Sequence, residues 1–216
     1  MVTYGRRMRA LAQESYAQQS RTKEAEQTLA QQYGAALDQF GRLVRLVEPQ
    51  QWGLPTPCRQ WTVRDLVNHV TVEQRWVPPL LAGTPATAVG DRLEGDLLGS
   101  DPVLAWKQAA AEAEEAVHAD GALERTVRLW EGPALAAHLC SQLAMDTVVH
   151  SWDLARAIGA DERLPGGLVA FALREVSAYP DRLAGSGLFD SPRAVLPGSD
   201  AQTRLLALTG RDSSPV

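Results

Sequence analysis

Hydrophobic residues recur along most of this chain at steps of three and four positions, as the buried face of an amphipathic helix requires. The first such stripe comprises Leu29, Tyr33, Leu37, Phe40, Val44 and Val47. It predicts a long helix that ends before Pro49, because proline cannot continue the helical hydrogen-bond ladder. The preceding residues 1–26 are polar and rich in Gln, Arg and Glu, so we expect a helical N-terminal extension with little to bury.

A second helix is marked by a capping signal. Thr62 is followed three positions later by Asp65, an arrangement typical of a helix start, and apolar spacing then continues to Pro78, where we expect the helix to end. The stretch before it, WGLPTPCRQW (52–61), contains two prolines and a glycine, and it predicts an extended connection.

The rest of the chain continues the helical pattern. Asp101 and Pro102 predict the start of a third helix, which Gly121 ends. The stretch RTVRLW (125–130) is typical of a short strand or an extended crossover, and two further helices are expected over about 133–159 and 166–180. A short closing helix is expected to dock through Leu205, Leu206 and Leu208.

These elements predict an all-α fold. Helical spacing dominates, and the sequence has no series of strands able to form a sheet. We therefore expect a bundle of four main helices with short additional helices over residues 27–212, preceded by the extension.

Composition narrows the possible functions. The 216 residues are 45% hydrophobic with a formal net charge of -5, which disfavours binding to nucleic acid or to an anionic membrane surface. No apolar run reaches the length of about 18 residues that a spanning helix needs. Cys58 and Cys140 do not form a C-x-x-C pair, so we expect reduced thiols in a cytoplasmic protein.

Polar residues interrupt the apolar faces at two places. His69 shares a helix face with Leu66 and Val70. On the later helix, residues four apart differ by about 40° of rotation, so Asp146, His150 and Asp153 follow one stripe. The i, i+4 pair of Asp146 and His150 allows a carboxylate oxygen and an imidazole nitrogen to converge on one point.

Several interpretations of these residues are open from spacing alone. Asp146 and His150 are either a locally hydrogen-bonded pair or two ligands of a metal whose third ligand comes from a facing helix, which would leave coordination positions open. His138 is a reserve ligand on the same helix. Asp153 either orients His150, caps a neighbouring helix or pairs with Arg156. Cys58 is either a ligand of a soft metal or a packing residue, and its place in the predicted loop favours packing.

Two separated motifs resemble one known family. The segment W-(x)2-PTPC-(x)2-WTV-(x)-DL-(x)2-HV, which begins at Trp52, is followed by D-(x)3-HSWDLARAIG from Asp146. Together they are similar to the DinB-like metal-binding superfamily, and most to its actinobacterial branch with the metal-binding domain of mycothiol-dependent maleylpyruvate isomerase. The closing RLLALTGRD is also similar to the end of that branch.

The resemblance implies a four-helix bundle that holds a divalent metal. Residue by residue, the family's ligands fall on His69, Asp146 and His150. Zinc is the first expectation for the metal, with nickel, iron and manganese as alternatives. The isomerase is expected to have Glu where this chain has Asp146, a shorter side chain.

The activity implied by the resemblance is a metal-dependent isomerase or transferase reaction on a small molecule, with mycothiol as the thiol cofactor. Glu73 and Asp153 are candidate catalytic residues, and Arg75 and Arg156 are candidates to hold a substrate carboxylate.

Two other functions remain open at this point. One is a metal-dependent hydrolase, lyase or cyclase of specialised metabolism, in which water replaces the thiol and Glu73, Asp153 or His138 acts as the acid or base. The other is a non-catalytic metal-binding bundle. Either a monomer or a homodimer is compatible with the sequence.

Overall fold

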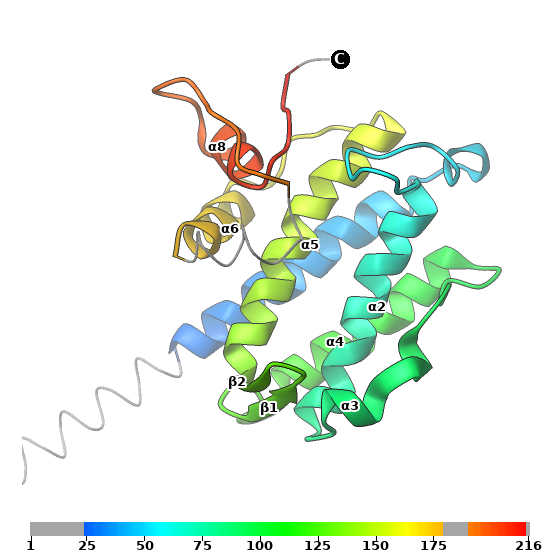
Figure 1. Cartoon of the computed structure of the whole chain (residues 1–216), viewed down its shortest axis with the longest axis vertical. Helices are drawn as coiled ribbons and strands as arrows, with labels where there is room; N and C mark the ends of the chain where they lie inside the picture. Colours follow the sequence, from blue (N-terminus) through cyan, green and yellow to red (C-terminus); the bar gives the residue numbers. More distant parts are fainter. Residues whose placement is uncertain (1–23, 179–189, 215–216) are drawn as a thin grey trace, which may run out of the picture.

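The computed structural model describes residues 24–178 and 190–214. Within them, long helices form a bundle, as Figure 1 shows: residues 24–44, α2 (Val63–Leu81), α4 (Pro102–His118) and α5 (Ala136–Ile158). Two further helices, α6 (Gly166–Ala178) and α8 (Ala201–Leu208), continue the chain; α6 contacts α5, and α8 contacts α6. The predicted all-α bundle with additional helices is confirmed.

Large apolar side chains hold the long helices together. Tyr33 and Phe40 of the first helix are fully buried, and the Phe40 ring lies 4.8 Å from the Trp106 ring of α4. The Tyr33 hydroxyl donates a hydrogen bond to Oε1 of Gln74 on α2. α5 contributes Trp152, which is 1% exposed. α5 contacts α2 and α6, so its polar residues are held between packed layers.

The predicted start of α2 is confirmed, whereas its predicted end at Pro78 is wrong. Thr62 Oγ1 accepts a hydrogen bond from the Asp65 amide at 3.2 Å, and Asp65 Oδ2 accepts one from the Thr62 amide at 2.9 Å. The helix then continues through Pro78 and Pro79 to Leu81. Proline removes a helical donor but leaves its own carbonyl available, and Pro78 O accepts from the Ala82 amide. The burial of Leu80 and Leu81 stabilises this last turn.

Short elements connect the long helices. They are the 3-10 helices Pro49–Gln51 and Gly90–Leu93, the helix α3 (Ala86–Val89), and the strands β1 (Thr126–Leu129) and β2 (Gly132–Leu135). The strand expected near residues 125–130 is present, and it pairs antiparallel with β2 in the register Thr126↔Leu135 to Leu129↔Gly132. Because β2 occupies Pro133, α5 begins at Ala136, later than the sequence predicted.

The N-terminal extension and the closing helix were both predicted, and the structure describes only a small part of the first. Of the extension expected over 1–26, residues 24–26 fall within the described part of the chain and are helical; the remainder lies outside it. At the other end, α8 docks as predicted, with Leu205 and Leu206 fully buried and Leu208 partly buried. Among the described residues, no helix is long and apolar enough to cross a membrane.

Candidate metal centre

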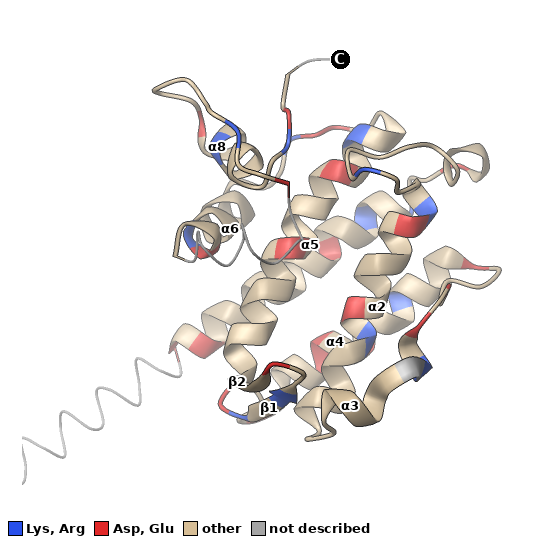
Figure 2. Ribbon diagram, in the orientation of Figure 1, with Lys and Arg blue, Asp and Glu red and all other residues tan. Residues whose placement is uncertain are grey.

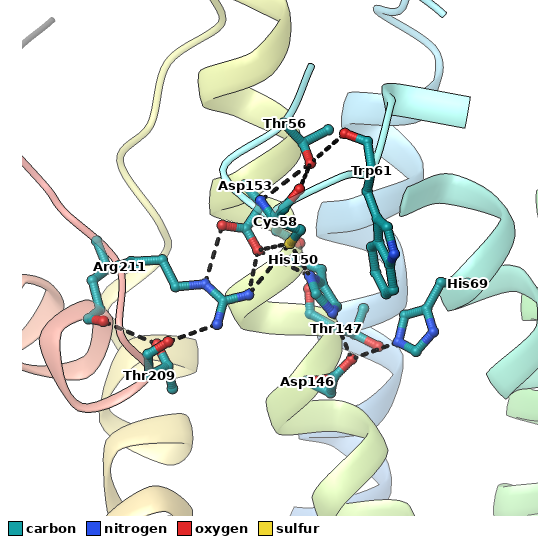
Figure 3. A network of polar contacts seen from close by, with 12 residues as sticks. Thr56, Cys58, Trp61, His69, Asp146, Thr147, His150, Asp153, Thr209 and Arg211 are labelled. Atoms are coloured by element: carbon teal, nitrogen blue, oxygen red, sulfur yellow. Dashed lines mark hydrogen bonds and ion pairs between the residues drawn. The ribbon is translucent and has the colours of Figure 1, made fainter. Parts of the chain in front are cut away.

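Four of the predicted polar residues meet between two helices. His69 projects from α2, whereas Asp146, His150 and Asp153 project from α5 (Figure 3). Asp146 Oδ2 lies 3.1 Å from His150 Nε2 and 3.6 Å from His69 Nε2. The contact between α2 and α5 therefore brings together the three predicted ligands, although His69 precedes Asp146 by 77 positions in the sequence.

The polar side chains of α5 are deeply buried. Asp146 is 5% exposed, His150 3% and Asp153 0%. Figure 2 shows acidic residues within α5, a helix that otherwise carries few charges. A buried charge is costly unless an opposite charge or a metal compensates it. These residues must therefore be partnered with one another or with a bound cation.

Asp146 Oδ2 has the environment of a metal ligand. It is buried and forms no hydrogen bond of acceptable geometry in the described structure, although two imidazole nitrogens face it. The ligand atoms of His69, Asp146 and His150 all lie within 4.8 Å of one another. Two imidazoles and one carboxylate are a donor set that suits zinc and related divalent metals. The residues present thus fit the metal that the family resemblance implies.

The pKa shifts of His150 and Asp146 agree with a site for a positive charge. Burial opposes a charge on His150, but the negative charge of Asp146 and the contacts with Asp153 and Cys58 outweigh it and raise the His150 pKa well above its ordinary value. Burial also raises the pKa of Asp146, yet the facing histidines reverse this and hold that pKa far below its usual range. Asp146 is a carboxylate that demands a cationic partner.

A second cluster lies on the other side of the same imidazole. His150 Nδ1 is 2.9 Å from Asp153 Oδ2, and Cys58 Sγ donates to the same oxygen at 3.3 Å. Cys58, His150 and Asp153 also have metal-ligand spacing. However, the Arg211 guanidinium already lies there, with Nη2 2.7 Å from Asp153 Oδ2. A cation is therefore built into this cluster, and the cluster around Asp146 is the better metal site.

Asp153 is placed where an orienting residue is needed. Its carboxylate contacts His150 on one side and Arg211 on the other. Burial raises the Asp153 pKa, but the hydrogen bond to His150 and the charge of Arg211 outweigh it and lower that pKa. Asp153 is thus an acceptor for His150 Nδ1, as the predicted orienting role requires.

Glu73 lies one turn beyond His69 on α2. Its Oε1 is 3.5 Å from His69 Nε2, and its Oε2 is buried without a hydrogen-bond partner in the described structure. Burial, followed by the nearby charge of Asp146, raises the Glu73 pKa well above its ordinary value. The structure therefore brings this candidate beside the three proposed ligands, as a group that favours its protonated form.

The other candidates are placed less centrally. Arg75 Nη1 lies 3.6 Å from Glu112 Oε2 on α4, and Arg75 does not line the cavity next to the site. Arg156 does line that cavity, but its Nε and Nη2 each donate to the Glu162 carboxylate at 2.9 Å. Its Nη1 and Nη2 also donate to the backbone carbonyls of Asp212 and Ser214, and its guanidinium lies over the Trp152 ring. His138, half-buried near the start of α5, belongs to neither cluster of metal-ligand spacing.

A cavity of about 860 Å³ adjoins the site. Its walls come from the 54–61 connection, the C-terminal end of α5 and the segment 190–212, and His150 is part of its lining. Trp61 also lines the cavity, and its ring centroid lies 4.7 Å from that of His69 and 5.9 Å from that of His150. A small molecule in the cavity would thus meet the histidine that faces Asp146.

The sequence did not predict two residues that contact Asp153 beside the proposed metal site. The sequence favours packing for Cys58, but its thiol contacts Asp153 and Arg211. Arg211 was given no role, although it follows directly on the closing helix in the quoted stretch RLLALTGRD. The similarity of this stretch to the family indicates that it matters, but spacing along the chain gives no reason to connect residue 211 with residue 153. Only the docking of α8 brings them together.

Comparison with known proteins identifies relatives over much of the chain. Residues 33–155 match the family model of the mycothiol maleylpyruvate isomerase N-terminal domain. Two uncharacterized proteins of Mycobacterium tuberculosis, Rv0738 and MT0763, from strains H37Rv and CDC 1551, are each 34% identical to this chain over 128 residues. The match covers 57% of this chain and spans 64% of the length of each relative.

Two solved structures have a similar fold. A crystal structure of mycothiol-dependent maleylpyruvate isomerase aligns with a TM-score of 0.55 at 19% identity, covering 75% of this chain and 72% of the solved one. A mutant of that enzyme aligns with a TM-score of 0.55 at 18% identity, covering 73% and 68%. The three proposed ligands lie inside the matched range 33–155, whereas Arg211 lies outside it.

Proposed function

Because the chain belongs to the family of the mycothiol maleylpyruvate isomerase N-terminal domain, we propose that it is a metal-dependent enzyme that uses mycothiol to isomerise a small molecule or transfer a group to it. His69, Asp146 and His150 are the proposed metal ligands. Zinc is the proposed metal, since imidazole and carboxylate ligands with open positions are typical of catalytic zinc sites.

One observation carries this proposal: the buried Asp146 Oδ2 faces two imidazole nitrogens and accepts no hydrogen bond in the described structure. Leaving a buried carboxylate oxygen unsatisfied is expensive. A divalent cation between the three side chains removes that cost and uses all three as ligands.

The reaction chemistry divides between the metal and the chain. When bound, a divalent cation acts as a Lewis acid that lowers the pKa of a coordinated thiol, which favours the nucleophilic thiolate at neutral pH. The chain holds that site in position: Asp153 orients His150, and Trp61 packs against both histidine rings. Glu73, with its raised pKa, is the proposed proton donor beside His69.

The cavity supports a small polar substrate. Four arginines contribute to its lining: Arg59, Arg156, Arg193 and Arg211. Each also has a carboxylate neighbour, so the wall combines both charges. Arg59 is the most available, since its side chain is 86% exposed and its nearest acidic atom, on Asp190, is 3.7 Å away. We propose Arg59 and Arg156 as contacts for a substrate carboxylate; Arg75 remains a weaker candidate.

Metal analysis tests the proposed site. The wild type, His150→Ala and His138→Ala are purified without chelator or metal-affinity resin, and their metal content is measured by plasma mass spectrometry. We expect close to one equivalent in the wild type and in His138→Ala, and loss of metal in His150→Ala. His138 is a matched control because it lies on the same helix but outside both clusters. Equal metal content in all three folded proteins would contradict the ligand assignment.

Calorimetry separates the thiol reaction from its alternatives. Mycothiol is titrated into the zinc-loaded wild type and into Arg59→Met, at concentrations up to the millimolar range. We expect binding to the wild type and weaker binding to Arg59→Met. Metal-loaded protein that binds no mycothiol would favour a hydrolase, lyase or cyclase, in which water takes the place of the thiol.

A further inference from the structure

The Arg211 guanidinium is enclosed at the back of the proposed metal site. Its side chain is 8% exposed, and it contacts Asp153 through two nitrogens, Nη2 to Oδ2 at 2.7 Å and Nε to Oδ1 at 3.2 Å. Nη2 also lies 3.5 Å from Cys58 Sγ, and Nη1 donates to the Thr209 carbonyl at 2.7 Å. This two-point contact fixes the plane of the Asp153 carboxylate as well as its position.

The end of α8 holds Arg211 in this place. The Arg211 amide donates to Leu206 O and the Gly210 amide to Ala207 O, which is the hydrogen-bond pattern of a Schellman motif. Gly210 has a φ of +80°, and a Cβ at this position would come within 2.8 Å of the Asp190 backbone. Both the turn and the close approach therefore require glycine. Arg211 extends from a fixed backbone, not from a free tail.

The contact between Arg211 and Asp153 determines which nitrogen of His150 donates a hydrogen bond. Asp153 paired with a guanidinium is ionised and can only accept, so His150 Nδ1 must donate to it at 2.9 Å. The other nitrogen, Nε2, then faces Asp146 Oδ2 at 3.1 Å, on the side where His69 also points. Figure 3 shows this sequence of side chains running from Thr209 and Arg211 through Asp153 and His150 to Asp146.

We propose that Arg211 is a positioning residue of the metal centre, through which the C-terminal segment outside the family-matched range 33–155 fixes Asp153 and thereby His150. This inference rests on the proposed metal site. Arg211 acts on that site through its contact with Asp153 at 2.7 Å. It fixes the Asp153 carboxylate that accepts the Nδ1 proton, so that Nε2 is available to the metal.

Zinc affinity of the full chain tests this inference. Arg211→Met keeps the length of the side chain but removes its charge and donors, whereas Arg211→Lys keeps the charge without the planar two-point contact. Affinity is measured by competition with a chelator, with folding checked by circular dichroism. We expect Arg211→Met to weaken zinc binding by about 10- to 100-fold, and Arg211→Lys to lie between it and the wild type.

A matched control and a second readout separate positioning from anchoring. Arg204→Met changes an exposed arginine on α8 and should leave zinc affinity unchanged. The nitrogen chemical shifts of His150 in the zinc-loaded protein, recorded by NMR, should show Nδ1 protonated in the wild type and should change in Arg211→Met. If Arg211→Met does not fold, Arg211→Lys decides by the same two readouts.

The outcomes distinguish the inference from the function on which it rests. A wild type that binds zinc, together with a folded Arg211→Met or Arg211→Lys that binds it equally well and keeps the same His150 shifts, would overturn the positioning role only. Arg211 would then merely anchor the C-terminal segment. A wild type that binds neither zinc nor cobalt would overturn the proposed metal site and this inference together.

Discussion

His150 Nε2 lies 3.1 Å from Asp146 Oδ2, one helical turn earlier on α5, and both side chains are buried. With Nδ1 donating to Asp153, Nε2 and Oδ2 would meet as two acceptors unless a proton or a cation lies between them. This relationship makes Asp146 the residue whose substitution tests the site most directly.

Asp146→Asn should weaken zinc binding by more than about 100-fold, because losing a ligand costs at least as much as losing the outer partner of one. The amide keeps the shape of the carboxylate but not its charge. Chelator competition measures the change, and Asp161→Asn, an exposed residue just beyond α5, is the control. Equal affinity in Asp146→Asn and the wild type would remove Asp146 from the ligand set.

Trp61 should report metal binding by fluorescence. Its ring is within 6 Å of both histidine rings, at 4.7 and 5.9 Å between centroids. A paramagnetic Co²⁺ ion held by those histidines is expected to quench it. Trp61→Phe should therefore lose most of the quenching on Co²⁺ titration. Trp130→Phe, which changes the ring on the β-hairpin beside Trp76, should keep it. Quenching that persists undiminished in Trp61→Phe would place the metal elsewhere.

The two cysteines should differ sharply in reactivity. Cys140 is fully buried, and burial raises its pKa to about 12. The thiolate is the reactive form, so at pH 8 Cys140 should stay unmodified by iodoacetamide in the folded protein. Cys58 is partly exposed and lines the cavity, so it should be alkylated. Mass spectrometry of peptides gives the extent at each site. Modification of Cys140 at a rate similar to Cys58 would contradict the packing described for α5.

Thr62→Ala should destabilise the protein by about 1 kcal/mol, since it removes the cap of α2. The effect should depend on pH. Hydrogen bonds from Thr62 lower the Asp65 pKa, so this interaction stabilises the fold above the unfolded-state pKa and is lost as pH falls through the folded-state pKa. Urea unfolding at neutral and acidic pH measures the difference between variant and wild type. A difference that widens in acid would contradict this account.

The positions of the helices were accessible from sequence because local signals determine them. Apolar spacing marked the first helix and α5, and capping residues marked the starts of α2 and α4. The signal at Pro78 failed because tertiary burial of Leu80 and Leu81 outweighs the loss of helical donors. The hairpin partner β2 was missed because a four-residue strand leaves too little pattern to identify.

The sequence by itself determined which residues could form a metal site, since the i, i+4 spacing of Asp146 and His150 and the family motifs require no tertiary information. The tertiary structure alone decided their partners. It placed His69 opposite Asp146, brought Glu73 to their side and left Arg75 with Glu112. It also brought Arg211 to Asp153. A contact between residues 58 positions apart depends on how α8 docks, and helical periodicity does not predict how a helix docks.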